Sequence, residues 1–313
     1  MAFRGFRILR AVPSLDYFRF HKLCFAISIF LCVASVVSLA TRGLNFGVDF
    51  AGGILIEARK TTPIDLADVR AKVNALNLGD ISLQEFGRNT DILLRVQSQG
   101  DEKAEMAAVQ KIRETLGTEF SYERVEVVGP RVGKELIRDA VIAIILALSG
   151  IMAYMAFRFS WRAGLSGVVA ILHDCLTTVG LFSILGLQFD LNTVAAVVTI
   201  AGFSINDTVV IDDRIRENTR LYKSMDFREL INLSVNQTMA RTLMTNGLVL
   251  LSTLALLIFG GPLLFGLAFA LLWGVIAGTY STIYVAAPME WYLAARGRKH
   301  IKASEAEGEP SHS

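Results

Sequence analysis

Six apolar stretches, each long enough or nearly long enough to cross a bilayer, constrain the fold of this chain more than any other feature. A membrane-spanning helix needs about 20 consecutive apolar residues. The stretches cover residues 23–40, 136–157, 164–187, 191–211, 243–259 and 263–293. Hydrophobic residues make up 53% of the 313 residues and the mean hydropathy is +0.47, which argues against a soluble domain. The sequence therefore predicts a polytopic α-helical membrane protein with six transmembrane helices.

The first apolar stretch follows a basic N-terminal segment, residues 1–22, in which Asp16 is the single acid. A basic flank, an apolar core and the small residues at positions 38–40 also fit a cleavable signal peptide. The apolar core is longer than that of most signal peptides, so an uncleaved anchor at residues 23–40 is the favoured interpretation. Both interpretations place the N-terminus in the cytoplasm and the following residues outside.

Residues 41–135 are mixed in polarity and contain no stretch that could cross a membrane. Alternating apolar residues predict four strands, and two amphipathic patterns between them predict helices. The predicted strands are residues 53–58, 81–86, 92–96 and 122–128, and the helices run from Pro63 to Gly79 and from Gly100 to Gly117. The order β-α-β-β-α-β predicts a ferredoxin-like extracytoplasmic domain between the first two spans. The segment has no His, so we expect a binding or lever module rather than a catalytic domain.

The charges of the connecting segments predict how the chain crosses the membrane. The turn at residues 158–162 and the segment after residue 295 are basic, whereas residues 186–190 and 260–262 contain no Lys or Arg. The positive-inside rule then places both termini in the cytoplasm. Residues 212–241 become a cytoplasmic loop, in which residues 227–240 predict an interfacial helix. The tail, residues 296–313, is predicted to be disordered and cytoplasmic.

Polar and ionisable residues within the spans are the candidate functional residues. Spans two to six occupy residues 136–295, and the fourth of the six spans carries Ser204, Asn206 and Asp207 near its inner third. A carboxylate there costs at least about 2.5 kcal/mol, so its default interpretation is functional. The alternative is that Asp207 lies at the helix end, among the lipid headgroups beside Asp212 and Asp213.

Three further ionisable residues occupy apolar segments: His173 and Asp174 on the third span, and Arg241, close to Asn246, at the start of the fifth. A carboxylate that moves between a desolvated environment and the neighbourhood of a guanidinium can take up a proton on one face and release it on the other. The alternatives are static polar contacts between helices, or, for Arg241, a side chain that extends to the headgroups.

Other features exclude several classes of function. The three cysteines lie in apolar stretches without CxxC spacing, which gives no disulfide framework and no metal site. A net charge of +2, without a basic and aromatic surface, argues against nucleic-acid binding. A glycine-rich motif follows the first span and contains Gly47, Asp49, Gly52 and Gly53. Its glycines allow a tight change of direction into the first strand, although the motif alone also fits a linker.

Four motifs occur in order along the chain: FGVDFAGG at residues 46–53, HDCLTTVG at 173–180, SINDTVVIDDRIREN at 204–218 and NQTMARTLMT at 236–245. Together they resemble the SecF branch of the bacterial SecD/SecF family, in the resistance-nodulation-division superfamily. The resemblance covers all but the tail. It implies that Asp207 and Arg241 are the family's proton-coupling residues, whereas Asp212 and Asp213 are interfacial charges. It assigns no role to His173 or Asp174.

The resemblance also implies partners and a function. The partners are SecD, with a matching six-span half, the SecYEG channel, often YajC, an unfolded preprotein and, indirectly, SecA. The complex would use the proton-motive force, without a bound cofactor, to promote late-stage export across the bacterial cytoplasmic (inner) membrane. Alternatives are a half-transporter for a small molecule or lipid, a structural subunit, and an intramembrane enzyme supported by His173 and Asp174 alone. The sequence leaves open whether H⁺ or Na⁺ is coupled.

Overall fold

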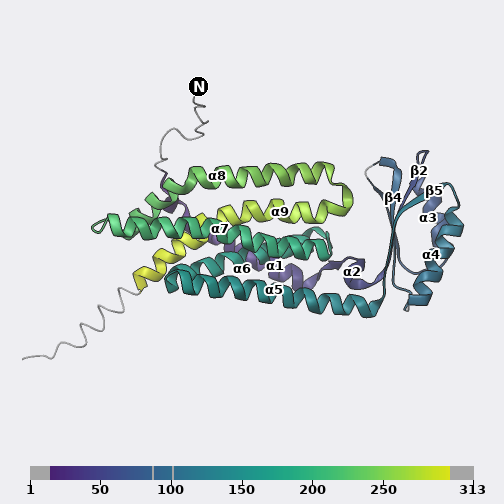
Figure 1. The fold of residues 1–313 in the computed structure, drawn as a ribbon, viewed down its shortest axis with the longest axis horizontal. Helices are drawn as coiled ribbons and strands as arrows, with labels where there is room; N and C mark the ends of the chain where they lie inside the picture. The colour runs from purple at the N-terminus through teal and green to yellow at the C-terminus, as the bar shows by residue number, and fades with distance from the viewer. Residues whose placement is uncertain (1–14, 87, 101, 297–313) are drawn as a thin grey trace, which may run out of the picture.

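The computed structural model describes residues 15–86, 88–100 and 102–296, and shows a long helix bundle with a small sheet domain at one end (Figure 1). The described residues include six helices that are long and apolar enough to cross a membrane, which confirms the six predicted spans. The bundle helices are α1 (His21–Thr41), α5 (Pro130–Arg158), α6 (Trp161–Leu185), α7 (Leu191–Leu221), α8 (Phe227–Phe259) and α9 (Gly261–Ser281). A short 3₁₀ turn, η1 (Tyr17–Arg19), precedes α1.

The last span is a single long helix that contains one irregular turn. Helix α9 passes into a π-helical turn, Thr282–Ala286, and helical backbone then continues to Arg296. The end of the bundle away from the sheet, where α5 ends and α6 begins, is called the distal end below (Figure 1). Of the tail predicted to be disordered, residues 297–313 lie outside the described part of the chain, and Arg296 is helical. Most of the basic segment 1–22 also lies outside the described part.

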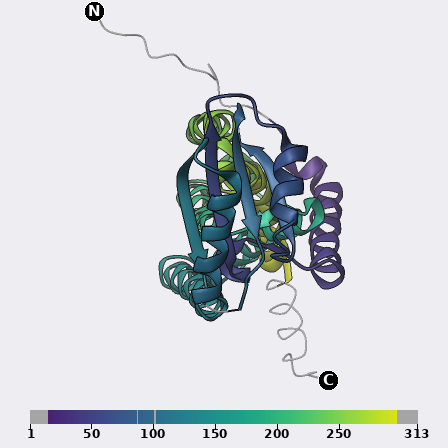
Figure 2. The same ribbon diagram turned by 90° about the vertical axis from the view of Figure 1, so that its right-hand side faces the viewer.

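The sheet domain has the element order that the sequence predicts. Its elements are β2 (Gly53–Lys60), α3 (Leu66–Asn74), β3 (Ile81–Phe86), β4 (Arg88–Val96), α4 (Glu102–Leu116) and β5 (Phe120–Val128). The antiparallel sheet has the order β3-β4-β2-β5. Alternate residues of the strands face α3 and α4, which lie on the side of the sheet away from the bundle (Figures 1 and 2). Their core is centred on Ile54, Ile56 and Ile112.

A two-residue strand pair that the sequence does not indicate connects the first span to the bundle. Strand β1 (Asn45–Phe46) pairs in parallel with β6 (Gln188–Phe189), which lies between α6 and α7. A single helical turn, α2 (Val48–Ala51), then leads into the sheet. The glycine-rich motif is therefore an ordered junction rather than a free linker.

The predicted loop over residues 212–241 is mostly helical. Helix α7 continues to Leu221 and α8 begins at Phe227, so residues 227–240 belong to the fifth span and do not form a separate interfacial helix. A 31-residue helix is about 46 Å long and extends well past a hydrocarbon core of about 30 Å. The extensions pack on one another through Ile215, Leu230 and Ile231, which explains why charged residues do not end either helix.

Two glycines allow the close helix contacts that position the polar residues of the bundle. A Cβ added at Gly180 of α6 would lie 2.1 Å from Ser35 of α1. A Cβ at Gly274 of α9 would lie 2.2 Å from Ile200 of α7. Small residues of this kind let membrane helices approach closely. Gly180 thus lets α1 pack closely on α6, and Gly274 lets α9 pack closely on α7; α6 in turn contacts both α7 and α9.

Candidate functional site

Asp207 lies inside the bundle and not at a helix end, because α7 continues for 14 residues beyond it. Its side chain is 4% exposed. The amide of Asn246 on α8 donates to Oδ2 of Asp207 at 2.5 Å and is also 2.6 Å from the hydroxyl oxygen of Thr279 on α9. Thr279 is not among the residues predicted from the sequence, although it begins a run of four hydroxyl-bearing residues, 279–282, within the apolar sixth span. The structure thus brings a carboxylate and two polar side chains together where three helices meet.

Arg241 and Asn206 are not part of this cluster. Both side chains lie on the outer surface of the bundle, Arg241 on α8 and Asn206 on α7. Within the described part of the chain, neither side chain makes a hydrogen bond or ion pair. The side chains of the two residues therefore point away from the interior of the bundle, where the carboxylate of Asp207 is buried.

Asp174 forms a second buried centre, in which Ser204 takes part. Asp174 is fully buried, and its Oδ2 accepts hydrogen bonds from the hydroxyls of Ser204 on α7 and Ser281 on α9, both at 2.7 Å. Its Oδ1 lies 2.9 Å from Nδ1 of His173. Ser204 is therefore separated from Asp207, even though both belong to one motif, and Ser281 is an additional member. The centre ties α6, α7 and α9 together.

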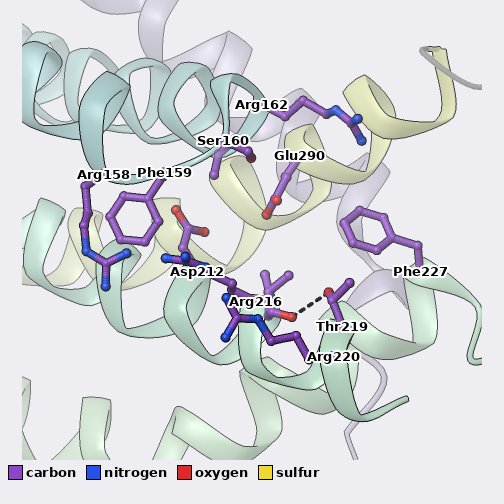
Figure 3. Close-up of a pocket in the computed structure, with 12 residues that line it drawn as sticks. Arg158, Phe159, Ser160, Arg162, Asp212, Arg216, Thr219, Arg220, Phe227 and Glu290 are labelled. Carbon is purple, nitrogen blue, oxygen red and sulfur yellow. Dashed lines mark hydrogen bonds between the residues drawn. The ribbon is translucent and has the colours of Figure 1, made fainter. Parts of the chain in front are cut away.

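The prediction that Asp212 and Asp213 are both interfacial charges is wrong for Asp212. Asp213 is exposed and forms an ion pair with Arg158 at 3.2 Å. Asp212 is only 7% exposed and lines a pocket of about 550 Å³ at the distal end, together with Glu290 (Figure 3). The two neighbours face different surroundings because consecutive helical residues are rotated by about 100°.

The glycine-rich motif joins the sheet domain to the start of α7. Oδ2 of Asp49 accepts a hydrogen bond from the backbone N–H of Leu191 at 3.0 Å, and the N–H of Gly47 donates to the carbonyl of Phe189 at 2.9 Å. Gly52 and Gly53 have φ angles of +77° and +123°, and a Cβ on Gly53 would lie 2.4 Å from the carbonyl oxygen of Val96. Both positions therefore require glycine.

A charged side chain of the sheet domain faces the same junction. Burial lowers the pKa of the Arg95 guanidinium on β4, and the nearby charges of Asp190 and Asp49 oppose that shift. Arg95 and Asp190 line a cavity of about 670 Å³ between the domain and the bundle. Asp190 also caps α7, since Oδ1 accepts from the N–H of Thr193 at 2.8 Å. The acids at the start of α7 therefore have a cationic neighbour in the sheet domain.

The described residues contain no group of three or more His, Cys, Asp or Glu side chains that could hold a metal ion. The three cysteines within them are unpaired, two of them partly buried and Cys175 buried.

Six membrane-crossing helices, one β-α-β-β-α-β domain and carboxylates buried between helices define a polytopic membrane protein with titratable groups inside its spans. A family model for the protein export membrane protein SecD/SecF, C-terminal, matches residues 108–296, and a model for the SecD/SecF GG motif matches residues 37–59. The chain belongs to the SecD/SecF family, as the four motifs predict.

Relatives and solved structures agree with this membership. The chain is 41% identical over 303 residues to the protein translocase subunit SecF of Cereibacter sphaeroides, covering 94% of this chain and 93% of that one. It is 38% identical to that of Vibrio alginolyticus, covering 97% of each. The crystal structure of SecDF, a translocon-associated membrane protein from Thermus thermophilus, matches with a TM-score of 0.80 and 32% identity over 92% of this chain. SecDF in a super-membrane-facing form matches with a TM-score of 0.69 and 33% identity over 94%. The chain spans 40% of the length of each solved chain.

Proposed function

We propose that this protein is the SecF half of a SecD–SecF complex that uses the proton-motive force to promote late-stage preprotein translocation across the bacterial cytoplasmic (inner) membrane. Relatives that are protein translocase subunits, and a translocon-associated SecDF structure of which this chain matches 40%, support the export role. The observation that carries the proton coupling is Asp207, a carboxylate buried between three membrane helices with an amide as its hydrogen-bond donor.

In this proposal Asp207 binds and releases the proton. Desolvation favours the neutral form of a carboxyl group, and a nearby guanidinium favours the charged form. Arg241 has no ion-pair partner among the described residues, so its charge is available when α7 and α8 move relative to each other. A helix movement that brings Arg241 closer to Asp207 would release the proton, and the reverse movement would allow its uptake.

The outer faces of α7 and α8 support SecD as the partner. The exposed stripe of α7 contains small and polar residues at helical spacing, Ala195, Thr199, Gly202 and Asn206, beside one large apolar residue, Phe203. Small residues permit close helix packing in membranes, and a face with Asn206 and Arg241 would be costly against lipid. This face fits a second helical half with complementary polar groups, and Asp207 lies directly behind it.

The remaining partners follow from the family. We expect the complex to work with the SecYEG channel, with YajC, and on a preprotein that SecA has driven in with ATP. We place the multi-pass chain in the bilayer with both termini in the cytoplasm, so that the sheet domain lies on the far side, where an unfolded preprotein emerges. We expect no bound cofactor, since the gradient supplies the energy.

The substitution Asp207→Asn tests the proposal in the complex with SecD. The amide has nearly the same shape but does not exchange a proton, so gradient-dependent export into vesicles should be lost while co-purification with SecD is retained. Asp213→Asn is the matched control, because it removes an exposed carboxylate from the same helix. Export at the wild-type level by Asp207→Asn would refute the mechanism. Collapsing the H⁺ and Na⁺ gradients separately identifies the coupled ion.

A further inference from the structure

Asp212 and Glu290 face each other at the distal end of the bundle, and neither has a partner among the residues that the structure describes. Asp212 lies on α7, and Glu290 lies on the helical segment that follows the π-helical turn. Each side chain is 7% exposed, and Oδ2 of Asp212 and Oε2 of Glu290 accept no hydrogen bond from any described residue. Figure 3 shows both carboxylates pointing into the same pocket. Buried polar atoms are nearly always hydrogen-bonded, so two orphaned carboxylates in one pocket point to a ligand.

The other charged groups around this pocket are arginines. Arg158 comes from α5, Arg162 from α6, and Arg216 and Arg220 from α7, whereas α8 contributes the uncharged Phe227. Within the described residues none of the four forms an ion pair with Asp212 or Glu290; Arg158 pairs with Asp213, and Arg162 points away from Glu290 (Figure 3). Arginine does not release its proton in proteins. The two carboxyl groups are therefore the groups in this pocket that can exchange one.

Two carboxylates in a buried pocket favour a shared proton. Each charge loses its hydration on burial, and the two like charges repel each other, so one proton held between them relieves both costs. The pocket of about 550 Å³ is wide enough to admit water, which can deliver or remove that proton.

The pair lies on the same helix as the proposed coupling residue and further towards the distal end. Asp212 follows Asp207 by five residues, which is about 7.5 Å along α7. Between these levels the hydroxyl oxygen of Thr208 on α7 lies 3.2 Å from that of Thr282, the first residue of the π-helical turn that leads to Glu290. Turns of this kind are frequent at functional sites. This hydroxyl pair joins α7 to the last span just beyond the level of Asp207, so the two helices that carry Asp212 and Glu290 are held together there.

We propose that Asp212 and Glu290 form a proton-exchange site through which the proton carried by Asp207 passes to or from the distal side. The inference rests on the proposed proton coupling by Asp207. In the step, a proton leaves a carboxyl oxygen of Asp207 and is taken up by a carboxylate oxygen of the pair, with water carrying it over the distance between the two levels. The proton that the pair already shares leaves to water in the pocket, and no bond other than O–H is formed or broken.

The experiment compares the double variant Asp212→Asn/Glu290→Gln with Asp207→Asn and Asp213→Asn in the full-length complex with SecD. The first readout is gradient-dependent export as a function of pH on the distal side. The second is the infrared absorption of protonated carboxylic acid in the purified complex, which does not depend on transport. We expect the double variant to export about tenfold more slowly and to lose the pH response, since a positioned proton-transfer group contributes at least that factor. Asp213→Asn should behave as wild type.

The outcomes separate this inference from the proposed function. A wild-type pH response in the double variant, with export abolished in Asp207→Asn, overturns the proton-exchange site and leaves the coupling by Asp207 intact. Full activity of Asp207→Asn overturns the coupling itself. The infrared band decides the state of the pair independently: a shared proton predicts a titrating band that persists in Asp207→Asn and disappears in the double variant. A spectrum that the double substitution leaves unchanged overturns the inference. Co-purification with SecD verifies that each variant folds.

Discussion

Substitution of Asp174 distinguishes a structural tie between helices from a step in proton transfer. In Asp174→Ala, the hydroxyls of Ser204 and Ser281 and the ring of His173 lose their common acceptor. Hydrogen bonds between membrane helices contribute about 0.6–1.5 kcal/mol each, so the two from Ser204 and Ser281 amount to about 1–3 kcal/mol of unfolding free energy, and the contact with His173 lies within α6. Ser281 recovers part of this because its hydroxyl also lies 3.1 Å from the carbonyl oxygen of Gly278.

Asp174→Asn should cost much less than Asp174→Ala. The amide oxygen can replace Oδ2 as the acceptor of both serine hydroxyls, and the amide N–H can donate to Nδ1 of His173 if that ring carries its proton on Nε2. All three contacts are then kept, and we expect a loss of about 1 kcal/mol or less.

Equilibrium unfolding of the full chain in mixed micelles of increasing denaturing detergent measures both variants, and gradient-dependent export measures their function. If Asp174 is a structural tie, Asp174→Ala should lose more unfolding free energy than Asp174→Asn, and Asp174→Asn should retain export. Equal destabilisation by Asn and Ala would refute the reasoning, because the negative charge itself would then hold the helices together. Loss of export in a stable Asn variant would place Asp174 in the proton path.

Two further predictions concern the sheet domain. Gly53→Ala should reduce amide hydrogen-exchange protection in β2 and β4, because φ is +123° and the new Cβ would lie 2.4 Å from the Val96 carbonyl oxygen; the backbone alone costs about 1–3 kcal/mol. Gly100→Ala has a similar φ of +105° but open space around it, so a smaller effect there isolates the clash, and equal effects would contradict it. Glu57→Gln should raise the unfolding midpoint at neutral pH and not at acid pH. Burial raises the pKa of Glu57, although Arg124 opposes the shift, so the folded chain holds this proton more tightly and stability falls as pH rises through the titration. A midpoint difference that does not change with pH would contradict this cause.

Patterns within one segment were predictable from the sequence, whereas contacts between distant segments were not. The apolar stretches and the alternation in β2 to β5 carry local periodicity, and the structure confirms the six spans and the order of the sheet elements. The ends of α7 and α8 were missed because hydropathy reports the bilayer core, while helical backbone continues wherever the extensions find a packing partner.

The composition of the buried polar centres depends on which helices meet. Ser204 and Asp207 are three residues apart, a spacing that predicts one shared face, yet α6 packs against Ser204 and α8 against Asp207. Glu290 lies 78 residues from Asp212 and no pattern in the sequence pairs them. The polar residues of one helix can be found from the sequence, but their partners require the helix packing.

Helix α7 connects the glycine-rich junction at the sheet domain with the two buried carboxylates, Asp207 and Asp212. Its first turn is held by Asp190 and by Asp49 of the glycine-rich motif, and the first strand of the sheet domain begins at Gly53, the last residue of that motif. The same helix then carries Asp207 in its middle and Asp212 near its distal end. Because an α-helix transmits displacement along its axis with little compression, a movement of the sheet domain that shifts Asp49 also shifts both carboxylates relative to α8 and α9. The proposed coupling between an emerging preprotein and a proton therefore needs no separate relay: the helix that the domain holds is the helix that carries the acids.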